Sequence, residues 1–228
     1  MHKILLVDDT RHFLDLEATF LGRAECRIFT AGTGLEAIRI ARRELPDLIL
    51  LDIEMPEMNG LQACRILKSD AATQRIPVIM LTSMKMEEEA RRAGAEHYLR
   101  KPIDEPRFLA EVKRFVPIKE RDEERLDLTA PVTWWRDGEP ASGIMVNLSK
   151  SGFLVESADP PPVGARLAVS FTLPNDFSGK TIAAEVMVVR GASESVRGYG
   201  CRFFQISQSA RQVLESFFER NASRVVRV

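Results

Sequence analysis

The first hundred residues alternate short apolar runs with segments of helical periodicity. The runs are continuous rather than alternating, which is typical of strands buried on both faces of a parallel sheet, and they lie at residues 4–7, 27–30, 48–51, 78–81 and 98–99. Between and after them, apolar positions recur at helical spacing: Leu35, Ala37, Ile38 and Ala41; Leu61, Cys64, Ile66 and Leu67; and, in a helix over 104–115, Phe108, Leu109, Val112 and Phe115. The pattern predicts an α/β domain with a doubly wound parallel sheet of five strand–helix repeats over residues 1–117.

A different pattern begins after residue 117. The charged run 118–125 leads away from the last predicted helix, and strand-like runs separated by turn residues then follow at 130–135, 142–146, 152–156, 166–173, 181–190 and 198–205. The run 167–173 alternates apolar and polar residues, as a strand with one buried face does. Six short strands favour a closed antiparallel β-barrel, because closure removes exposed edges. We therefore predict an all-β domain over 118–228 that ends in a helix at 209–220, whose apolar face packs on the barrel or on a partner.

Composition narrows the possible partners and the compartment. The 228 residues contain 32 Lys and Arg against 33 Asp and Glu, whereas nucleic-acid-binding domains usually have a clear basic excess; nor does the second half read as a helix-turn-helix. We expect no DNA partner. Three dispersed cysteines fit a reducing compartment. The apolar runs are too short for a signal peptide or a membrane span, so the sequence predicts a cytoplasmic protein without a membrane-embedded segment.

Polar side chains stand where the predicted parallel strands end. Asp8 and Asp9 follow the first strand, Asp52 ends the third, Thr82 ends the fourth and Lys101 follows the fifth. The carboxyl ends of neighbouring parallel strands meet in one crevice, where ligands bind. Carboxylates gathered there would repel by about 4 kcal/mol per pair at ~4 Å and an effective dielectric of ~20. A hard cation such as Mg²⁺ removes that repulsion.

Such a site suits phosphoryl transfer. Beside a bound cation, Asp52 is a plausible nucleophile that would form an aspartyl phosphate. Lys101 can neutralise a phosphoryl oxygen and the Thr82 hydroxyl can donate a hydrogen bond to another. Taken singly, each acid could instead be a loop former or a helix N-cap. The five side chains in this order favour the phosphoryl site.

Residues 1–117 resemble the receiver domain of bacterial two-component response regulators, which is flavodoxin-like. The resemblance rests on the motifs Asp8-Asp9, Leu51-Asp52-Ile53-Glu54-Met55-Pro56 with Asn59-Gly60, Leu81-Thr82-Ser83, and Tyr98-Leu-Arg-Lys101-Pro102. It implies that Asp52 accepts phosphate from a histidine kinase. It also implies that Thr82 and Tyr98 form a switch pair, in which the tyrosine ring turns inward when Thr82 bonds the phosphoryl group.

The same resemblance implies a ligand set for Mg²⁺. Asp9, Asp52 and the backbone carbonyl of Glu54 would hold the cation, with Asp8 acting through a water molecule. A receiver domain also transfers and hydrolyses its own phosphoryl group, which is switching rather than turnover of a substrate. We therefore expect a signalling protein and not an enzyme.

The second half carries a group of residues suited to an anionic ligand. Arg121 and Arg125 stand four apart before the barrel, and Asn147, Ser149 and Gly152 lie between two predicted strands. Two guanidiniums can bind phosphate oxygens and stack on planar bases. Asn and Ser add short polar contacts, and the glycine lets the backbone turn close to a ligand. Alone, the arginines could equally be a solvated helix face and the Asn-Ser-Gly pattern an ordinary turn.

Together these residues make the segment 118–222 resemble the PilZ domain, a bacterial receptor module for cyclic di-GMP. The matching residues are Arg121 and Arg125, Asn147, Ser149 and Gly152, and the closing Gly200-x-x-Phe203. The resemblance implies that the arginine segment wraps one or two cyclic di-GMP molecules. The chain departs from an ideal anion site because Asp122, Glu123 and Glu124 stand between the two arginines. These acids could point to solvent or weaken binding.

We therefore predict a response regulator that is phosphorylated on Asp52 and whose PilZ domain binds cyclic di-GMP and acts on an unknown partner protein. The alternative is a protein-interaction module in which phosphorylation controls dimerisation and the barrel binds no nucleotide. The two helices at 104–115 and 209–220 are candidate faces of a homodimer. Because the charged run with Arg121 and Arg125 would continue the first of these helices, a ligand that fixes both arginines would also couple the two inputs.

Overall fold

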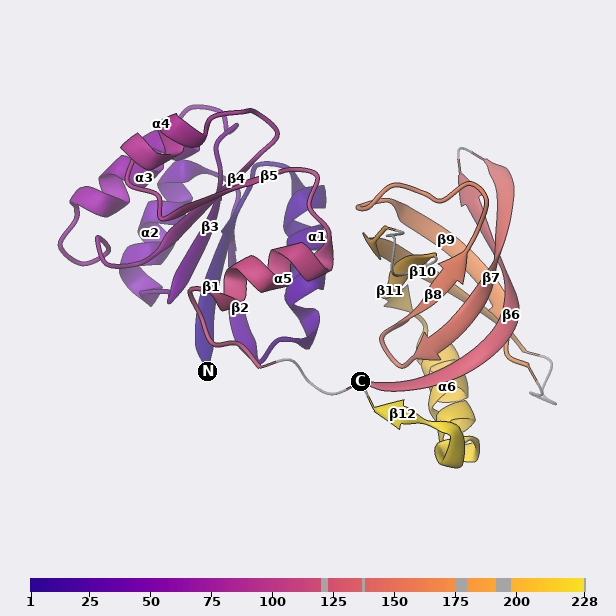
Figure 1. Ribbon diagram of the computed structural model, residues 1–228. Coiled ribbons are helices and arrows are strands. Elements are labelled where there is room, and N and C mark those ends of the chain that lie inside the picture. The colour runs from indigo at the N-terminus through magenta and orange to yellow at the C-terminus, as the bar shows by residue number, and fades with distance from the viewer. Residues whose placement is uncertain (120–122, 137, 175–179, 192–197, 228) are drawn as a thin grey trace. The chain divides into compact units, whose positions relative to one another are not determined.

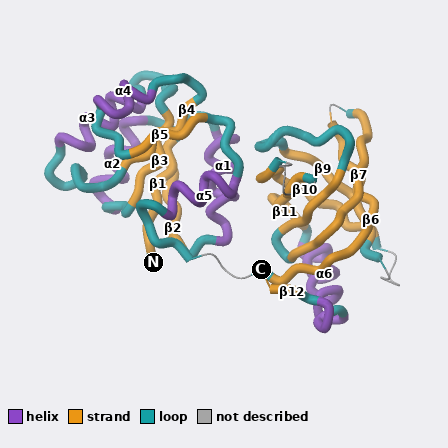
Figure 2. The backbone as a smooth tube through the Cα atoms, viewed as in Figure 1, coloured by secondary structure: helices purple, strands orange, loops and turns teal. Residues whose placement is uncertain are grey.

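The computed structural model describes residues 1–119, 123–136, 138–174, 180–191 and 198–227. The chain divides into two compact units, 1–121 and 122–228, and each is described by itself. Figure 2 shows helices and strands alternating in the first unit, whereas the second consists of strands and one long helix. No helix in the described ranges is long and apolar enough to cross a membrane.

The first unit is built on a parallel five-stranded sheet (Figure 1). The strand order is β2-β1-β3-β4-β5, so the chain winds out from the centre on both sides. The strands are β1 (His2–Val7), β2 (Cys26–Ala31), β3 (Leu48–Asp52), β4 (Val78–Thr82) and β5 (His97–Arg100). They coincide with the five apolar runs, which confirms the predicted fold class. All residues of β3 and β4 are buried, as a sheet covered on both faces requires.

Helices cover both faces of this sheet. Figure 1 shows α1 and α5 on one face and α2, α3 and α4 on the other. The helices are α1 (Arg11–Phe20), α2 (Gly34–Glu44), α3 (Gly60–Ser69), α4 (Glu87–Arg92) and α5 (Glu105–Lys113), and a short 3₁₀ turn (Leu21–Arg23) follows α1. Asn59 begins α3 with a capping box, and Asp104 caps α5 by accepting from the backbone N–H of Arg107. The caps fix where each helix starts after its loop.

Two members of the predicted helical stripes face solvent instead of the core. Leu35 in α2 is 57% exposed and Ile66 in α3 is 38% exposed. Each lies about 200° around its helix from a buried neighbour two positions away, namely Ala37 and Cys64. These two apolar residues therefore belong to the outer faces, and the core stripes are narrower than predicted.

The second unit is a closed six-stranded antiparallel barrel, as predicted. The order β6-β7-β8-β11-β10-β9 is closed by direct pairing of β6 with β9. Its strands are β6 (Glu124–Arg136), β7 (Glu139–Ser149), β8 (Gly152–Glu156), β9 (Arg166–Thr172), β10 (Thr181–Arg190) and β11 (Tyr199–Ile206). Helix α6 (Gln208–Arg220), a 3₁₀ turn (Ala222–Arg224) and the short β12 (Val226–Arg227), which pairs with β6, complete it.

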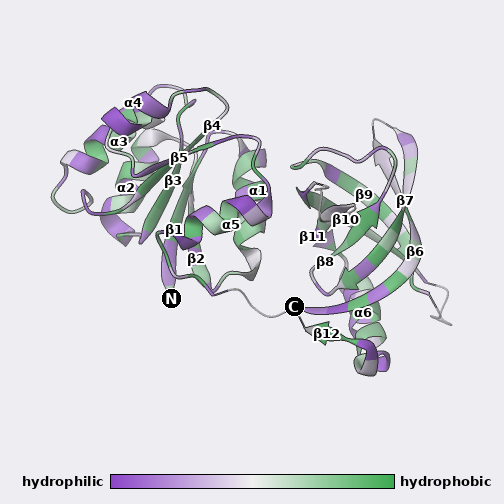
Figure 3. Ribbon diagram, in the orientation of Figure 1, coloured by the Kyte–Doolittle hydropathy of each residue, from purple (hydrophilic) through white to green (hydrophobic). Residues whose placement is uncertain are grey.

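The barrel interior is filled by side chains, and α6 adds to the same core. Trp134 and Tyr199 meet edge-to-face with their ring centroids 5.9 Å apart. From α6, Leu214, Phe217 and Phe218 are buried in this cluster. The apolar face of α6 thus packs on its own barrel, so it is not the free dimer face that we considered. Figure 3 shows the apolar colouring along the strands of both units.

The charged run before the barrel does not continue the last helix of the first unit. Helix α5 ends at Lys113, and Arg125 lies in β6, where it pairs with Ser149 of β7 and with Val226 of β12. Arg121 lies outside the described residues. Arg125 is held in a strand and not in a helix that continues α5, so the two inputs are not coupled through a continuous helix as we predicted.

Candidate functional sites

The carboxyl ends of the parallel strands bring the predicted polar residues together. Asp8 directly follows β1, Asp52 is the last residue of β3, Thr82 is the last of β4 and Lys101 directly follows β5. These four side chains are buried, with 9% exposure or less, while the neighbouring Asp9 is exposed. One edge of the sheet therefore holds a pocket of buried charge with one solvent-facing acid at its rim.

The three aspartates form a compact oxygen cluster. One carboxylate oxygen from each of Asp8, Asp9 and Asp52 lies within 4.8 Å of the other two. Lys101 joins this cluster from β5: its Nζ lies 2.5 Å from Asp8 Oδ2 and 3.2 Å from Asp52 Oδ1. Both buried acids are thus paired with the same ammonium group.

Backbone groups hold the two buried acids in place. The amide of Glu54 donates to Asp52 Oδ2 at 2.9 Å, and the amide of Thr10 donates to Asp8 Oδ1 at 2.7 Å. Gly60 allows the chain after β3 to return close to Asp52, because a Cβ at that position would lie 2.0 Å from the Asp52 carbonyl oxygen. Gly60 of the motif is therefore required by the close packing of the chain on the backbone of the acceptor.

Burial and charge oppose each other at this cluster. Burial raises the pKa of Asp52, and the ammonium of Lys101 offsets part of that rise. For Lys101, burial disfavours the charged form, but the surrounding carboxylates, that of Glu17 first, outweigh it and raise the pKa. The lysine therefore stays protonated at neutral pH, and it is the fixed positive charge of the pocket.

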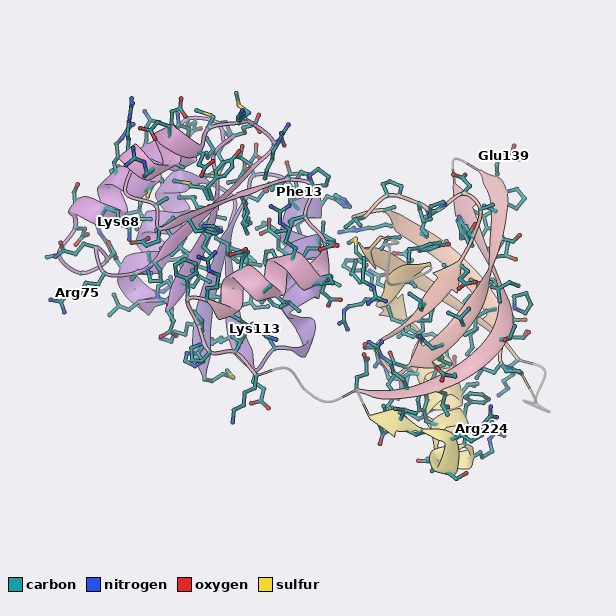
Figure 4. All side chains as sticks on the ribbon, viewed as in Figure 1. Phe13, Lys68, Arg75, Lys113, Glu139 and Arg224 are labelled. Atoms are coloured by element: carbon teal, nitrogen blue, oxygen red, sulfur yellow. The ribbon has the colours of Figure 1, made fainter. Side chains whose placement is uncertain are left out.

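Two residues near Lys101 were missed by the sequence analysis, which named no residue of α1. The ring of Phe13, labelled in Figure 4, lies under the ammonium with its centroid 4.1 Å from Lys101 Nζ. Glu17 is only 3% exposed, its Oε2 has no hydrogen-bond partner among the described residues, and burial raises its pKa to about 8. Its position between Leu14 and Phe20, on the buried stripe of α1, is the sequence signal that could have revealed it.

Thr82 and Tyr98 both contact the backbone of Met84 in this structure. The Thr82 hydroxyl, which is fully buried, donates to Glu54 Oε2 at 3.3 Å and accepts from the amide of Met84 at 3.2 Å. Tyr98 is half-buried against the core, and its hydroxyl donates to the Met84 carbonyl oxygen. Met84, in the loop after β4, therefore accepts from the Tyr98 hydroxyl and donates to the Thr82 hydroxyl.

The cluster fits a hard divalent cation. Its donors are carboxylate oxygens, the ligand type that Mg²⁺ prefers, and the exposed Asp9 leaves one side open to water and to a phosphate oxygen. Burial of Asp8 and Asp52 makes their negative charge costly unless positive charge is near. The three aspartates that we predicted as metal ligands, Asp8, Asp9 and Asp52, therefore lie close enough to bind one cation. Metal binding by the backbone carbonyl of Glu54 stays a prediction.

The barrel places the predicted nucleotide-binding residues on adjacent strands. Arg125 of β6 pairs with Ser149 of β7, and Asn147, half-buried two positions earlier on β7, pairs with Asp127. Arg125 lies one residue before the core residue Leu126 and points to the opposite side of the strand. Arg125, Asn147 and Ser149 therefore share the outer side of the barrel wall.

Ser149 and Gly152 have structural duties of their own. The Ser149 hydroxyl accepts from the amide of Gly152 at 3.1 Å and donates to its carbonyl oxygen at 3.0 Å, which closes the turn between β7 and β8. A Cβ on Gly152 would lie 2.0 Å from the Cys201 carbonyl oxygen of β11. The close approach of two strands is thus a structural reason for a glycine here, and the ligand contact that we expected stays a prediction.

A further arginine, which sequence reasoning did not single out, lies beside this turn. Arg202 pairs with Gly152 across the β8–β11 ladder and is 8% exposed, and its Nη1 donates to Ser151 Oγ at 2.8 Å. Its place in the Gly200-Cys-Arg-Phe203 segment, at an outward position of a strand that carries the buried Cys201, was the available signal. The barrel therefore presents two described arginines to the same turn.

Comparison with known proteins assigns a family to each unit. The family model of the response regulator receiver domain matches residues 4–113, and that of the PilZ domain matches residues 119–220. The polar-differentiation response regulators DivK of Brucella ovis and Brucella anthropi are each 36% identical over 116 residues, which cover 50% of this chain and 94% of theirs. The chain therefore belongs to the response regulators, with a receiver domain followed by a PilZ domain.

Solved structures resemble the first half of the chain. The chemotaxis response regulator CheY4 of Vibrio cholerae is 28% identical with a TM-score of 0.49, covering 51% of this chain and 99% of its own. The N-terminal domain of a response regulator receiver protein from Methanoculleus marisnigri is 34% identical with a TM-score of 0.43, covering 51% and 97%.

Proposed function

We propose that the receiver domain is a phosphorylation switch in which Asp52 accepts a phosphoryl group from a histidine kinase. The observation that carries this proposal is the convergence of Asp8, Asp9 and Asp52 within 4.8 Å, with Lys101 Nζ 3.2 Å from the acceptor. An Asp52 carboxylate oxygen attacks phosphorus, the phosphorus–nitrogen bond of the kinase phosphohistidine breaks, and the imidazole leaves.

The residues of the pocket divide the work of that transfer. The Glu54 amide holds Asp52 Oδ2, which leaves Oδ1, on the side of Lys101, as the attacking oxygen. Lys101 supplies positive charge to a phosphoryl oxygen, and the buried Thr82 hydroxyl is a donor for another once it leaves Glu54. Asp8, Asp9 and Asp52 would hold Mg²⁺, which when bound supplies neutralisation of phosphoryl charge.

Phosphorylation can be tested without the cognate kinase. The full chain is incubated with acetyl phosphate and Mg²⁺, and the phosphorylated form is separated by phosphate-affinity electrophoresis. We expect a shifted band for the wild type and none for Asp52→Asn. Asp47→Asn removes a carboxylate from the opposite end of β3, where Asp47 contacts the Lys3 amide, and should behave as the wild type. An equal shift in Asp52→Asn would refute the assignment.

We also propose that the PilZ domain binds cyclic di-GMP on the outer wall of the barrel. Arg125 and Arg202 supply guanidiniums that can bind phosphate oxygens and stack on guanine. The Arg125 Nε–H is buried and has no hydrogen-bond partner among the described residues, so a donor is left for an acceptor from outside the chain. Asn147 adds a polar side chain on the same side of the wall. The downstream partner would be a protein that reads this liganded surface.

Calorimetric titration with cyclic di-GMP tests this assignment against the alternative. Binding to the wild type that is lost in Arg125→Ala supports a nucleotide receptor. No heat from either protein favours the interaction module controlled by phosphorylation, and analytical ultracentrifugation with and without acetyl phosphate would then test dimerisation. In both cases we propose a cytoplasmic signalling protein that turns over no substrate other than its own phosphoryl group.

A further inference from the structure

One of the acids between the two predicted arginines occupies the candidate nucleotide site. Glu123 lies directly before β6 and is 8% exposed. Its Oε2 lies 3.3 Å from Arg125 Nη2, and its Oε1 accepts a hydrogen bond from the Ser151 hydroxyl. Ser151 Oγ in turn accepts from Arg202 Nη1 at 2.8 Å. Glu123, Arg125, Ser151 and Arg202 form one network, which we call the Glu123 cluster.

The burial of this cluster shows that Glu123 is not a solvated acid. The side chain of Glu123 is 9% exposed, whereas that of Arg125 is 29% exposed and opens to solvent. A carboxylate buried to this degree needs positive charge and donors close by. Arg125 and the Ser151 hydroxyl meet that need, because the hydroxyl is itself polarised by the guanidinium of Arg202.

The neighbouring acid has a different environment. Glu124, the first residue of β6, pairs with Lys150 at 2.9 Å, and its side chain is 36% exposed. It carries the same charge one residue away, and successive side chains of an extended chain point to opposite sides. Removing the charge of Glu124 tests the effect of nearby negative charge on ligand affinity, whereas removing that of Glu123 also tests the effect of its ion pair with Arg125.

A carboxylate and a phosphodiester bind guanidinium in the same way. Both are anions that accept from its N–H donors through oxygen atoms. A phosphate placed on Arg125 beside the bound carboxylate would face repulsion of the order expected for two like charges ~4 Å apart, which is large at any protein-like dielectric. Cyclic di-GMP and the Glu123 carboxylate are thus alternative occupants of Arg125.

We propose that Glu123 is an intramolecular competitor of cyclic di-GMP, so that the ligand binds by displacing this carboxylate from Arg125 and Ser151. Displacement also frees the Ser151 hydroxyl and lets Arg202 act as a further phosphate-binding arginine. This inference rests on the proposed nucleotide binding. Residue 123 then helps to determine the affinity for cyclic di-GMP. The ligand must break the ion pair between Glu123 and Arg125 before it binds, and the free energy of that pair lowers the net free energy of binding.

The test is calorimetric titration of the full chain with cyclic di-GMP at fixed ionic strength, in wild type, Glu123→Gln and Glu124→Gln. Glutamine at 123 can still accept from Ser151 but does not hold Arg125 by charge. We expect Glu123→Gln to bind about tenfold tighter than the wild type, which corresponds to about 1.4 kcal/mol of lost competition. Glu124→Gln, which removes the same charge from the exposed pair, should stay within about threefold, or ~0.7 kcal/mol.

The outcomes separate this inference from the function on which it depends. Wild-type binding with equal gains in both glutamine variants, or with no gain in Glu123→Gln, overturns the competition and leaves the receptor assignment standing. Binding by Glu123→Gln alone supports the competition strongly. No heat from any variant overturns both. If Glu123→Gln does not fold, Ser151→Ala, which removes one anchor of the same carboxylate, is expected to bind tighter than the wild type, and weaker or equal binding would overturn the inference.

Discussion

The Nζ of Lys101 lies 3.2 Å from Oδ1 of Asp52, so the proposed acceptor carboxylate is already paired with a cation in the unphosphorylated receiver. The same Nζ contacts Asp8, and all three side chains are buried. Lys101 therefore stabilises the resting pocket as well as supplying charge to a phosphoryl group. This double duty leads to a test that separates folding from chemistry.

Substitution of Lys101 by Ala should destabilise the receiver in the absence of divalent cations. It leaves Asp8 and Asp52 as buried acids without their shared partner, a change that typically costs about 3 kcal/mol or more. Mg²⁺ should restore part of this loss, and it should raise the Tm of Lys101→Ala more than that of the wild type. Calorimetric scans in EDTA and in Mg²⁺ measure both effects. The exposed Lys85→Ala is the control; an unchanged Tm of Lys101→Ala in EDTA would contradict the prediction.

Phosphoryl mimicry should release Tyr98 from the Met84 carbonyl if Thr82 and Tyr98 are a switch pair. The chain has two tyrosines, and the other, Tyr199, is buried in the barrel core. Fluorotyrosine labelling therefore gives two ¹⁹F signals, which Tyr98→Phe assigns. Beryllofluoride with Mg²⁺ should shift the Tyr98 signal alone, and Thr82→Ala should abolish that shift. A Tyr98 signal that does not respond in the wild type would exclude the switch.

Glu17 should make the receiver less stable as the pH rises from about 4.5 to about 8. Burial raises the pKa of Glu17 from 4.5 to about 8, so over this range the unfolded chain has released a proton that the folded chain still holds. Stability therefore falls with rising pH in this window and levels off above it. The contribution is at most about 5 kcal/mol.

Glu17→Gln is the variant that checks this pH dependence. Its Tm should exceed that of the wild type by an amount that grows between pH 5 and pH 8, because glutamine does not titrate. Glu89→Gln, on the exposed surface of α4, provides the matched control. A Tm difference between Glu17→Gln and wild type that is constant across this range would show that Glu17 does not titrate there.

Gly152→Ala should damage the barrel before it affects any ligand. The added Cβ would meet the Cys201 carbonyl oxygen at 2.0 Å, so β8 and β11 must move apart. We expect a loss of about 3 kcal/mol, the scale of overpacking in a tight core. A Tm measurement by circular dichroism checks it, with Gly191→Ala as the comparison, because an added Cβ there meets only Val163 Cγ2 at 3.8 Å, an ordinary van der Waals contact. A wild-type Tm in Gly152→Ala would contradict this prediction, because it would show that the strands accommodate the added methyl group without cost.

The strands of the receiver could be predicted because each buried strand is a continuous apolar run, and the polar residues at their ends then follow from parallel topology. The buried faces of the helices were harder to predict from the sequence than the strands. Leu35 and Ile66 are apolar and lie within two residues of core positions, and only the direction of each side chain around its helix distinguishes an outer residue from a buried one.

The missed residues share a physical reason. Glu17 and Arg202 are charged side chains in buried positions, and composition-based reasoning assigns such residues to the surface. Ser149 was recognised by its motif, but its two hydrogen bonds to Gly152 depend on the turn geometry. The Glu123 cluster joins residues from before β6, from the β7–β8 turn and from β11, which no local pattern connects.

Closure of the barrel by the β6–β9 pairing has a consequence for how the nucleotide site could adapt to its ligand. A strand with a neighbour on each side cannot slide or peel away without breaking two ladders at once. β9 pairs with residues 132–135 of β6, and at Arg125 the two neighbours are β7 and the short β12, so Arg125 also lies in a part of β6 that is paired on both sides. A bulky ligand is therefore accommodated by rotation of side chains such as that of Glu123, rather than by movement of the strand that carries Arg125.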